Sequence, residues 1–233
     1  MAREFLKVFH ELTYRWRPIE IWQDFIVMTA CAISNSIDKL NYEGREKTYM
    51  RIITKYNEKE RMLFPELVAA IVDELERNPN QDLLGRLYME LELGNKNTGQ
   101  FFTPYCVCEA MAEISSDKLI NDIEEKGYVT VNDPACGAGA TLIAEIHSIE
   151  RKLKDTNLNW QNHVLVYAQD IDYSVAMMCY IQLSLLGVAA YIKIGDTLSD
   201  PITNKESLKN IWTTPMLKSP IWTMRRIIHF GTR

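Results

Sequence analysis

Small residues and acids gather in the sequence in a pattern suited to binding a polar ligand. Two glycines lie in a run of small side chains, Asp133-Pro134-Ala135-Cys136-Gly137-Ala138-Gly139-Ala140. Such residues permit a tight turn and let a ligand approach the backbone and the N-terminus of a following helix. Further along, Asp170, Asp172 and Asp196 offer carboxylates that accept hydrogen bonds from hydroxyls or amines. A tight turn without a ligand, with solvated acids nearby, is the alternative interpretation.

The acids follow predicted strands of a parallel sheet. From residue 128 onward, short β-branched runs alternate with longer helical stretches, which is the pattern of βαβ units. We expect strands at 128–132, 164–169 and 190–194, and helices at 138–154 and 173–187. In an open parallel sheet the carboxyl ends of the strands line the ligand crevice. The pattern therefore predicts that the glycine loop and the acids meet at one edge of an α/β sheet.

Residues 1–95 have few strand signals and a helical spacing of apolar side chains. Pro18 precedes an amphipathic run from Ile21 to Ile37, and Pro65 is at a first-turn position for a helix over 67–75. Asn78-Pro79-Asn80 ends that helix, and another is expected over 81–91, ending at Gly94. We therefore divide the chain into an N-terminal helical region at 1–95 and a sheet domain at 96–233.

The composition is that of a globular protein with a real core. Of 233 residues, 47% are hydrophobic and 24% charged, which excludes disordered and collagen-like chains. Lys and Arg number 26 against 31 Asp and Glu, so the net charge is −5. A chain of this charge does not coat nucleic acid as a polycation, and any DNA contact must be local or shared.

The sequence predicts a cytoplasmic protein without a membrane segment or a metal site. Charges interrupt the apolar residues near the N-terminus, unlike a secretory signal, and the longest apolar stretch, 25–33, is too short to span a bilayer. Five cysteines form no CxxC pair, so we expect reduced thiols. Cys106-Val107-Cys108 lacks the further ligands that a metal would need.

A nicotinamide-dinucleotide loop fits the glycine segment poorly. Asp133-Pro134 stands where that fingerprint begins, and its third glycine is replaced near Thr141. The segment instead resembles the S-adenosylmethionine-binding motif of DNA adenine-N6 methyltransferases. Upstream, Gly99-Gln100-Phe101-Phe102-Thr103-Pro104 is similar to a segment of the modification subunit of type I restriction-modification systems. Downstream, Tyr167–Asp172 and Gly195–Leu198 are similar to the second and third cofactor motifs of that family.

This resemblance spans residues 94–198 and implies a class I S-adenosylmethionine-dependent methyltransferase fold, a Rossmann-like α/β sheet. It implies that Asp170 accepts both ribose hydroxyls, that Ile171 packs on the adenine, and that Asp196 accepts from the exocyclic amine of the cofactor. Asp133 and the loop backbone would face the methionine ammonium and carboxylate, and Phe102 with its neighbours would close over the methionine. The implied cofactor-binding residues are Phe102, Thr103, Pro104, Asp133, Pro134, Ala135, Gly137, Gly139, Asp170, Ile171, Asp196 and Thr197.

The catalytic motif of the resembled family, Asn or Asp followed by Pro, Pro and an aromatic residue, is not found in the sequence. That motif accepts hydrogen bonds from the target amine and stacks on a flipped base. Two segments resemble it partly. Asp200 and Pro201 lack an aromatic partner and follow Asp196 too closely, and Ser219-Pro220-Ile221-Trp222 has Ser in place of the amide or carboxylate. The weak catalytic candidates are Asp200, Pro201, Ser219, Pro220 and Trp222.

The segment 212–233 is basic and contains Trp212, Trp222 and Phe230, so it either contacts DNA or docks its aromatic residues on the sheet. By resemblance the chain methylates adenine N6 in DNA, with a specificity subunit or a second chain reading the sequence, in a hetero- or homo-oligomer. A non-catalytic cofactor-binding or regulatory module derived from such an enzyme is the second hypothesis. A small-molecule or RNA methyltransferase is the third.

Overall fold

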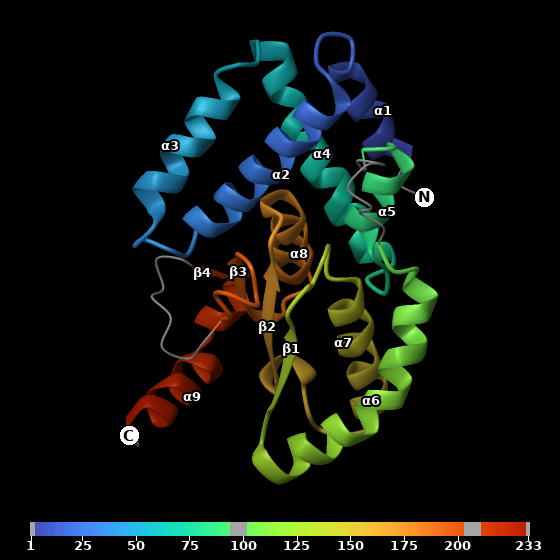
Figure 1. Cartoon of the computed structure of the whole chain (residues 1–233), viewed down its shortest axis with the longest axis vertical. Coiled ribbons are helices and arrows are strands. Elements are labelled where there is room, and N and C mark those ends of the chain that lie inside the picture. The colour runs from blue at the N-terminus through green and yellow to red at the C-terminus, as the bar shows by residue number, and fades with distance from the viewer. Residues whose placement is uncertain (1–2, 94–101, 203–210, 232–233) are drawn as a thin grey trace.

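A computed structural model describes residues 3–93, 102–202 and 211–231, with side chains up to residue 227. A helical region precedes a sheet flanked by further helices (Figure 1). The helices of the first part, which we call the helical cap, are α1 (Arg3–Leu12), α2 (Pro18–Asn35), α3 (Tyr42–Ile53), α4 (Glu58–Arg77) and α5 (Leu83–Glu90). The second part consists of α6 (Tyr105–Lys126), β1 (Val129–Asp133), α7 (Ala140–Leu153), η1 (Trp160–Asn162), β2 (Val164–Asp170), α8 (Tyr173–Leu185), β3 (Ala189–Ile194), β4 (Ile211–Thr213), η3 (Pro215–Lys218) and α9 (Pro220–Gly231).

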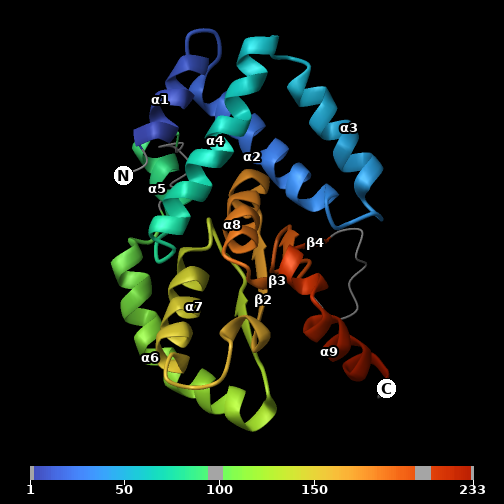
Figure 2. The same ribbon diagram turned by 180° about the vertical axis from the view of Figure 1, so that it is seen from behind.

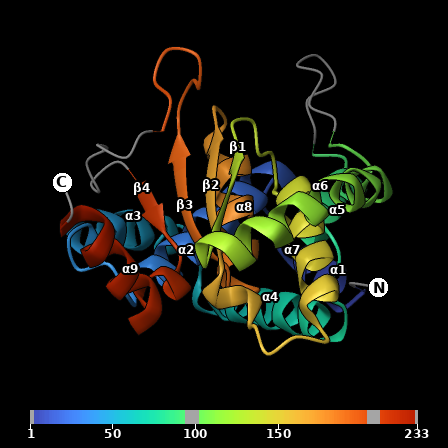
Figure 3. The same ribbon diagram turned by 90° about the horizontal axis from the view of Figure 1, so that it is seen from below.

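The described strands form one sheet in the order β1-β2-β3-β4 (Figure 3). The first three strands are parallel, as the sequence predicts, and their bounds differ from the prediction by one residue at most. β4 runs antiparallel to β3, so the expectation of a parallel sheet holds only for the first three strands. Thr214, the residue after β4, adds a side-chain hydrogen bond to β3, because its hydroxyl accepts from the backbone N–H of Ala190 at 2.9 Å.

Strand β2 is mostly apolar before Gln169 because both faces of the sheet are covered there. Val164, Val166 and Ala168 pack in the main core with residues of α7 and α8. On the other face, Leu165 packs against Leu217 of η3 and Trp222 of α9. Strand β2 is therefore packed on both of its faces.

The helical cap lies over α8, which separates it from the strands (Figures 1 and 2). An aromatic cluster fills the cap: Trp22 and Phe25 of α2 pack edge-on against Phe5 of α1. The guanidinium of Arg45 in α3 lies 3.9 Å from the ring centre of Trp212 in β4. It also donates to the backbone carbonyl of Ile211 at 3.3 Å. The cap is thus bonded to the last strand of the sheet as well as packed on α8.

The helix around Pro65 begins earlier than the sequence analysis expects. α4 starts at Glu58, and Pro65 lies inside it instead of in its first turn. Asn57 accepts from the backbone N–H of Glu60, and Glu60 accepts from that of Asn57, so a capping box sets the start. The proline then removes one hydrogen bond of the helix without ending it. Pro18 does begin its helix, and α4 ends at Arg77, just before Asn78, as expected.

Helix α6 was not assigned from the sequence. It packs along α7 on the outer side of the domain, where Ser148 of α7 donates to Ser116 of α6 at 2.9 Å (Figure 2). None of the helices in the described segments is both long and apolar enough to cross a membrane.

Candidate cofactor site

The glycine loop joins the end of β1 to α7 and depends on two left-handed residues. Gly137 has φ 55° and Gly139 has φ 98°, a backbone conformation that side chains disfavour. A Cβ on Gly139 would lie 3.0 Å from Sγ of Cys179 in α8. Hydrogen bonding with Cys136, followed by burial, raises the pKa of Cys179, so this thiol stays protonated beneath the loop. The loop therefore requires glycine both for its conformation and for its close approach to α8.

Asp133, the last residue of β1, holds the loop from within. Its Oδ1 accepts from the backbone N–H of Ala135 at 3.1 Å, and its Oδ2 accepts from the hydroxyl of Thr141. The carboxylate thus spans the loop from its beginning to the first turn of α7. The N-cap of that helix is Gly139, so no N-cap side chain accepts from its first N–H groups.

Asp170, the last residue of β2, joins the second motif to the glycine loop. Its Oδ2 accepts from the backbone N–H of Gly137 at 2.9 Å, and its Oδ1 accepts from that of Asp172, also at 2.9 Å. Asp172 in turn caps α8 by accepting from Val175. Ile171 between the two acids is 73% exposed, although it is a large aliphatic residue. It therefore presents apolar surface at the carboxyl end of β2.

The third motif follows β3 and reaches the glycine loop through Thr197, whose hydroxyl donates to the backbone carbonyl of Pro134. Asp196 is exposed. Hydrogen bonds from the backbone N–H of Leu198 and from the hydroxyl of Ser199 lower the pKa of Asp196. It is therefore a carboxylate at neutral pH and accepts hydrogen bonds.

The upstream segment also meets the glycine loop. The ring of Phe102 lies 3.5 Å from the place that a Cβ on Gly137 would occupy, and it packs edge-on against Tyr88 of α5. Thr103 and Pro104 are exposed, and Pro104 immediately precedes α6. Gly99, Gln100 and Phe101, which complete the resemblance here, lie outside the described residues.

Asp200 and Pro201 lie near the carboxyl ends of β2 and β3, in a segment tied to the sheet. Oδ1 of Asp200 pairs with Nζ of the buried Lys193 at 2.8 Å. Nε2 of Gln169 donates to the carbonyl of Asp200, and the Gln169 Oε1 accepts from Ile202, each at 2.8 Å. The Asp200 carboxylate is therefore already engaged in an ion pair.

The other catalytic candidates lie away from the glycine loop. Trp222 is 1% exposed and packs edge-on against Tyr128, which precedes β1 at the amino edge of the sheet. Its Nε1 donates to the carbonyl of Gln161 at 2.8 Å. Ser219 and Pro220 begin the same α9 segment. The structure thus places Ser219, Pro220 and Trp222 at the opposite edge of the sheet from Asp133 and Asp170.

The two tryptophans of the basic segment dock on the sheet domain, as one of the two interpretations predicts. Trp212 lies in β4 and packs against Tyr180 with ring centres 5.3 Å apart, and Trp222 is buried as described. Arg225 lies over the ring of Tyr128 and donates to the carbonyl of Gly127 at 2.8 Å. The side chain of Phe230 lies outside the described part of the chain.

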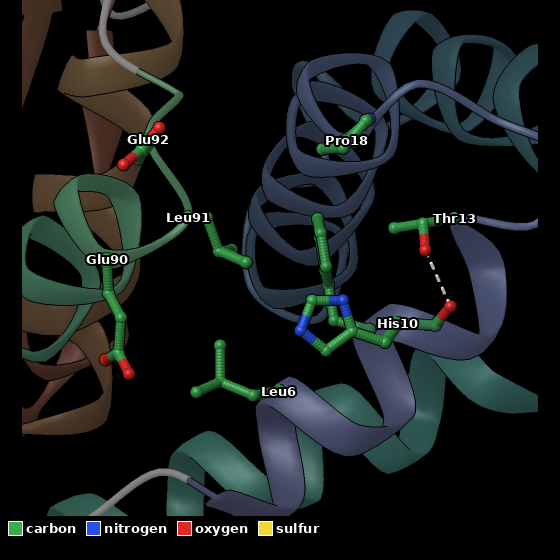
Figure 4. Close-up of a pocket in the computed structure, with 8 residues that line it drawn as sticks. Leu6, His10, Thr13, Pro18, Glu90, Leu91 and Glu92 are labelled. Atoms are coloured by element: carbon green, nitrogen blue, oxygen red, sulfur yellow. Dashed lines mark hydrogen bonds between the residues drawn. The ribbon is translucent and has the colours of Figure 1, made fainter.

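A cavity of about 380 Å³ lies elsewhere, in the helical cap between α1, the start of α2 and the end of α5 (Figure 4). Its lining combines apolar side chains with exposed acids, and comprises Leu6, Phe9, His10, Thr13, Pro18, Glu90, Leu91 and Glu92. None of the residues predicted to bind a cofactor is among them. In the described segments no three His, Cys, Asp or Glu residues gather as a metal would require.

Comparison with known proteins identifies the family. The sequence profile of the N-6 DNA Methylase family matches residues 80–229, which is more than half of the chain and includes the glycine loop, Asp170 and Asp196. The chain belongs to the N-6 DNA methylase family. Its fold is accordingly the class I S-adenosylmethionine-dependent methyltransferase fold, which confirms the fold and the family that the sequence predicts.

Two curated relatives of this N-6 DNA methylase family member are methylase subunits. The type I restriction enzyme MjaIX methylase subunit of Methanocaldococcus jannaschii is 26% identical over 152 residues, which cover 63% of this chain and 25% of the relative. The type I restriction enzyme MpnII methylase subunit of Mycoplasma pneumoniae is 28% identical over 159 residues, 66% of this chain and 26% of the relative. The matched part of the chain spans about a quarter of the length of either relative.

Two residues of this family member that bond to the segments around the glycine loop have no role in the sequence analysis. Gln169 is 0% exposed and fixes the segment after β3, and Thr141 binds Asp133. Gln169 carries a signal that sequence reasoning can use, because it is a polar residue inside an otherwise apolar buried strand. Thr141 carries no such signal in the sequence beyond its place in the first turn of a helix.

Proposed function

We propose that this chain binds S-adenosylmethionine and supplies the cofactor half of a DNA adenine-N6 methyltransferase. The observation that carries the proposal is the meeting of three motifs at one sheet edge. Asp170 bonds to Gly137 of the glycine loop, and Thr197 bonds to Pro134 of the same loop. The residues around this meeting point fit a ligand that combines an amino acid, a ribose and an adenine.

Each part of such a ligand has a matching group. A carboxylate oxygen accepts more than one hydrogen bond, so Asp170 retains acceptor sites for two ribose hydroxyls while it holds the loop. The exposed Ile171 offers an apolar surface to the adenine, and the ionised Asp196 accepts from its amine. The loop and the uncapped start of α7 face the amino-acid part. Phe102, with Thr103 and Pro104, covers it from the side of Gly137.

The bound cofactor would supply an electrophilic methyl group on its sulfonium. The contribution of this chain is to hold that group in place and to exclude alternative orientations, which lowers the barrier by proximity. The acceptor is adenine N6 of a base flipped out of the duplex. Among the described residues, Asp200 is paired with Lys193 and Ser219 lies at the far edge of the sheet. We therefore propose that the base-binding residues and the DNA readout come from another polypeptide segment, such as a specificity subunit or a second chain, in the cytoplasm.

A non-catalytic cofactor-binding module is the second candidate. The ion pair between Asp200 and Lys193 favours it, because this acid, the best placed of the weak catalytic candidates, is engaged in holding a loop. One experiment distinguishes the enzyme from the non-catalytic module. Transfer of a labelled methyl group from S-adenosylmethionine to adenine in DNA, by the chain with its partner, supports the enzyme. Cofactor binding without transfer to DNA, under all partner combinations, supports the module, and binding of no cofactor contradicts both.

A further inference from the structure

Gln182 joins three segments of the chain beneath the glycine loop. It lies in α8 and is 0% exposed. Its Nε2 donates to the backbone carbonyl of Ala138 and to Oδ1 of Asp82, both at 2.8 Å. Its Oε1 accepts from the backbone N–H of Leu84 at 3.0 Å. One amide side chain therefore bonds the glycine loop to the start of α5.

Asp82 determines which end of the Gln182 amide faces the loop. Asp82 caps α5, and its Oδ1 also accepts from the backbone N–H of Gly85 at 2.9 Å. Because that oxygen acts as an acceptor, it must face the NH₂ end of Gln182. The same NH₂ group then donates to the carbonyl of Ala138, and the amide oxygen accepts from the backbone N–H of Leu84. Every polar atom of the Gln182 amide is used, which is the condition for a buried amide to be stable.

Ala138 is the loop residue whose carbonyl Gln182 holds. It lies between Gly137 and Gly139, both left-handed, in a stretch where the backbone has unusual freedom to rotate. A hydrogen bond to its carbonyl fixes the peptide plane that it shares with Gly139. The N–H of Gly139, in the same plane, donates to the carbonyl of Cys136 at 2.8 Å. Gln182 therefore holds the peptide that closes the turn.

Helix α5 also contacts the loop by a second route. Tyr88 of α5 packs against Phe102 with ring centres 5.6 Å apart, and Phe102 lies against Gly137. Helix α5 therefore contacts the loop by two routes. It reaches Gly137 through Phe102, and it reaches the peptide before Gly139 through Gln182.

We propose that Gln182 is a positioning residue that holds the glycine loop in its cofactor-binding conformation, and that Asp82 holds Gln182. The inference rests on the proposed function for the identity of the ligand. It adds that cofactor affinity depends on a buried connection to the helical cap, made by residues that do not touch the cofactor.

The test compares Gln182→Leu, Asp82→Ala and Asp82→Asn with the wild type. Leu has nearly the size of Gln and forms no hydrogen bond. Asn keeps a side-chain oxygen that can accept from both Gly85 and Gln182, so it is the conservative rescue of Asp82. Ser148→Ala is the matched control, because Ser148 is also 0% exposed and bonds Ser116, about two turns into α7 and away from the loop.

Two readouts separate positioning from general stability, both taken where every variant is folded. In calorimetric titration with S-adenosylmethionine, we expect Gln182→Leu and Asp82→Ala to raise the Kd about tenfold or more, as loss of one or two buried hydrogen bonds implies. Asp82→Asn and Ser148→Ala should stay within about threefold. In hydrogen exchange of residues 134–143 without cofactor, only the first two variants should speed exchange at Gly139.

An unchanged Kd and unchanged loop exchange in Gln182→Leu would overturn the proposal. So would a Kd for Ser148→Ala that rises as much as that for Gln182→Leu, since the effect would then be general destabilisation. If Gln182→Leu does not fold, Asp82→Ala and Asp82→Asn are compared instead. Equal Kd values and equal loop exchange in these two variants would then overturn the proposal. A wild type that binds no S-adenosylmethionine contradicts the proposed function, and loop exchange still decides whether Gln182 positions the loop.

Discussion

The backbone N–H of Gly137 donates to Oδ2 of Asp170 across the gap between the first two strand ends. The two residues are far apart in the sequence, and this bond fixes the glycine loop relative to the acid that follows β2. A carboxylate bonded to a backbone N–H is also oriented, so its remaining acceptor sites face a defined direction. The loop and the acid therefore act as one binding unit, and we expect a change in either one to weaken ligand binding by both.

The left-handed turn gives a prediction about Gly139. Gly139→Ala should destabilise the protein by at least about 1 to 2 kcal/mol, the usual cost of a side chain in that conformation, because φ is 98° and Cys179 lies 3.0 Å from the new Cβ. Gly44→Ala is the matched control. Gly44 lies in α3 with no atom within 4 Å of a new Cβ, so the change should stabilise by up to about 1 kcal/mol. Urea unfolding measures both, and equal effects would contradict the assigned backbone geometry.

Arg45 should matter more to stability than a surface arginine. It pairs with Asp38 at 2.7 Å, and both side chains are about nine-tenths buried. Arg45→Met leaves the Asp38 carboxylate buried and also releases Trp212 of β4, so a loss of about 3 to 5 kcal/mol is expected. Arg151→Met removes a half-exposed pair with Glu113 and should cost far less, because exposed ion pairs contribute little to stability. Chemical unfolding of the two variants checks this, and similar losses would refute the connection between cap and β4.

Asp82 gives a prediction about pH. Burial raises its pKa above the ordinary value of 3.8, so the folded state retains a proton that the unfolded state releases. The resulting stabilisation is complete below pH 3.8 and is lost as the pH rises through the raised pKa. Asp82→Asn carries no such proton. The free energy of unfolding of the wild type, relative to Asp82→Asn, should therefore fall from acidic toward neutral pH. A difference independent of pH over that range would show that Asp82 is not buried as described.

Ser219 should be dispensable for methyl transfer. It lies at the amino edge of the sheet in the segment anchored by Trp222. The measurement is incorporation of labelled methyl into DNA by an assembly that contains this chain. Ser219→Ala should retain the wild-type rate, whereas Asp196→Ala should lower the rate at limiting cofactor because it weakens cofactor binding. A large drop in rate for Ser219→Ala would instead identify Ser219-Pro220-Ile221-Trp222 as a diverged catalytic loop.

The elements around the glycine loop could be predicted from the sequence because their signals are local. Short runs with β-branched residues that end close to an acid predict β1, β2 and β3. β4 could not be found this way. It has three residues, too few for a period, and it is held by distant groups such as Arg45.

The connections that hold the site were also outside sequence reasoning. Gln182 and Asp82 are 100 positions apart, and neither lies in a recognisable motif. Their pairing depends on how α8 packs beneath α5, which no local pattern specifies. The start of α4 is different, because the capping box of Asn57 and Glu60 is visible in the sequence. The predicted start is wrong because it relies on Pro65 as a first-turn residue instead of on the capping box.

Calorimetric titration with S-adenosylmethionine tests the central claim most directly, comparing the wild type with Asp170→Ala. Hydrogen bonds to a charged group are typically worth about 1.5 to 3 kcal/mol each, so the loss of two should raise the Kd well over tenfold. Asp155→Ala, which removes an exposed acid in the turn after α7, should bind as the wild type does. Equal affinity of Asp170→Ala and wild type, or no binding by the wild type, would contradict the assignment of the glycine loop and Asp170 to a cofactor site.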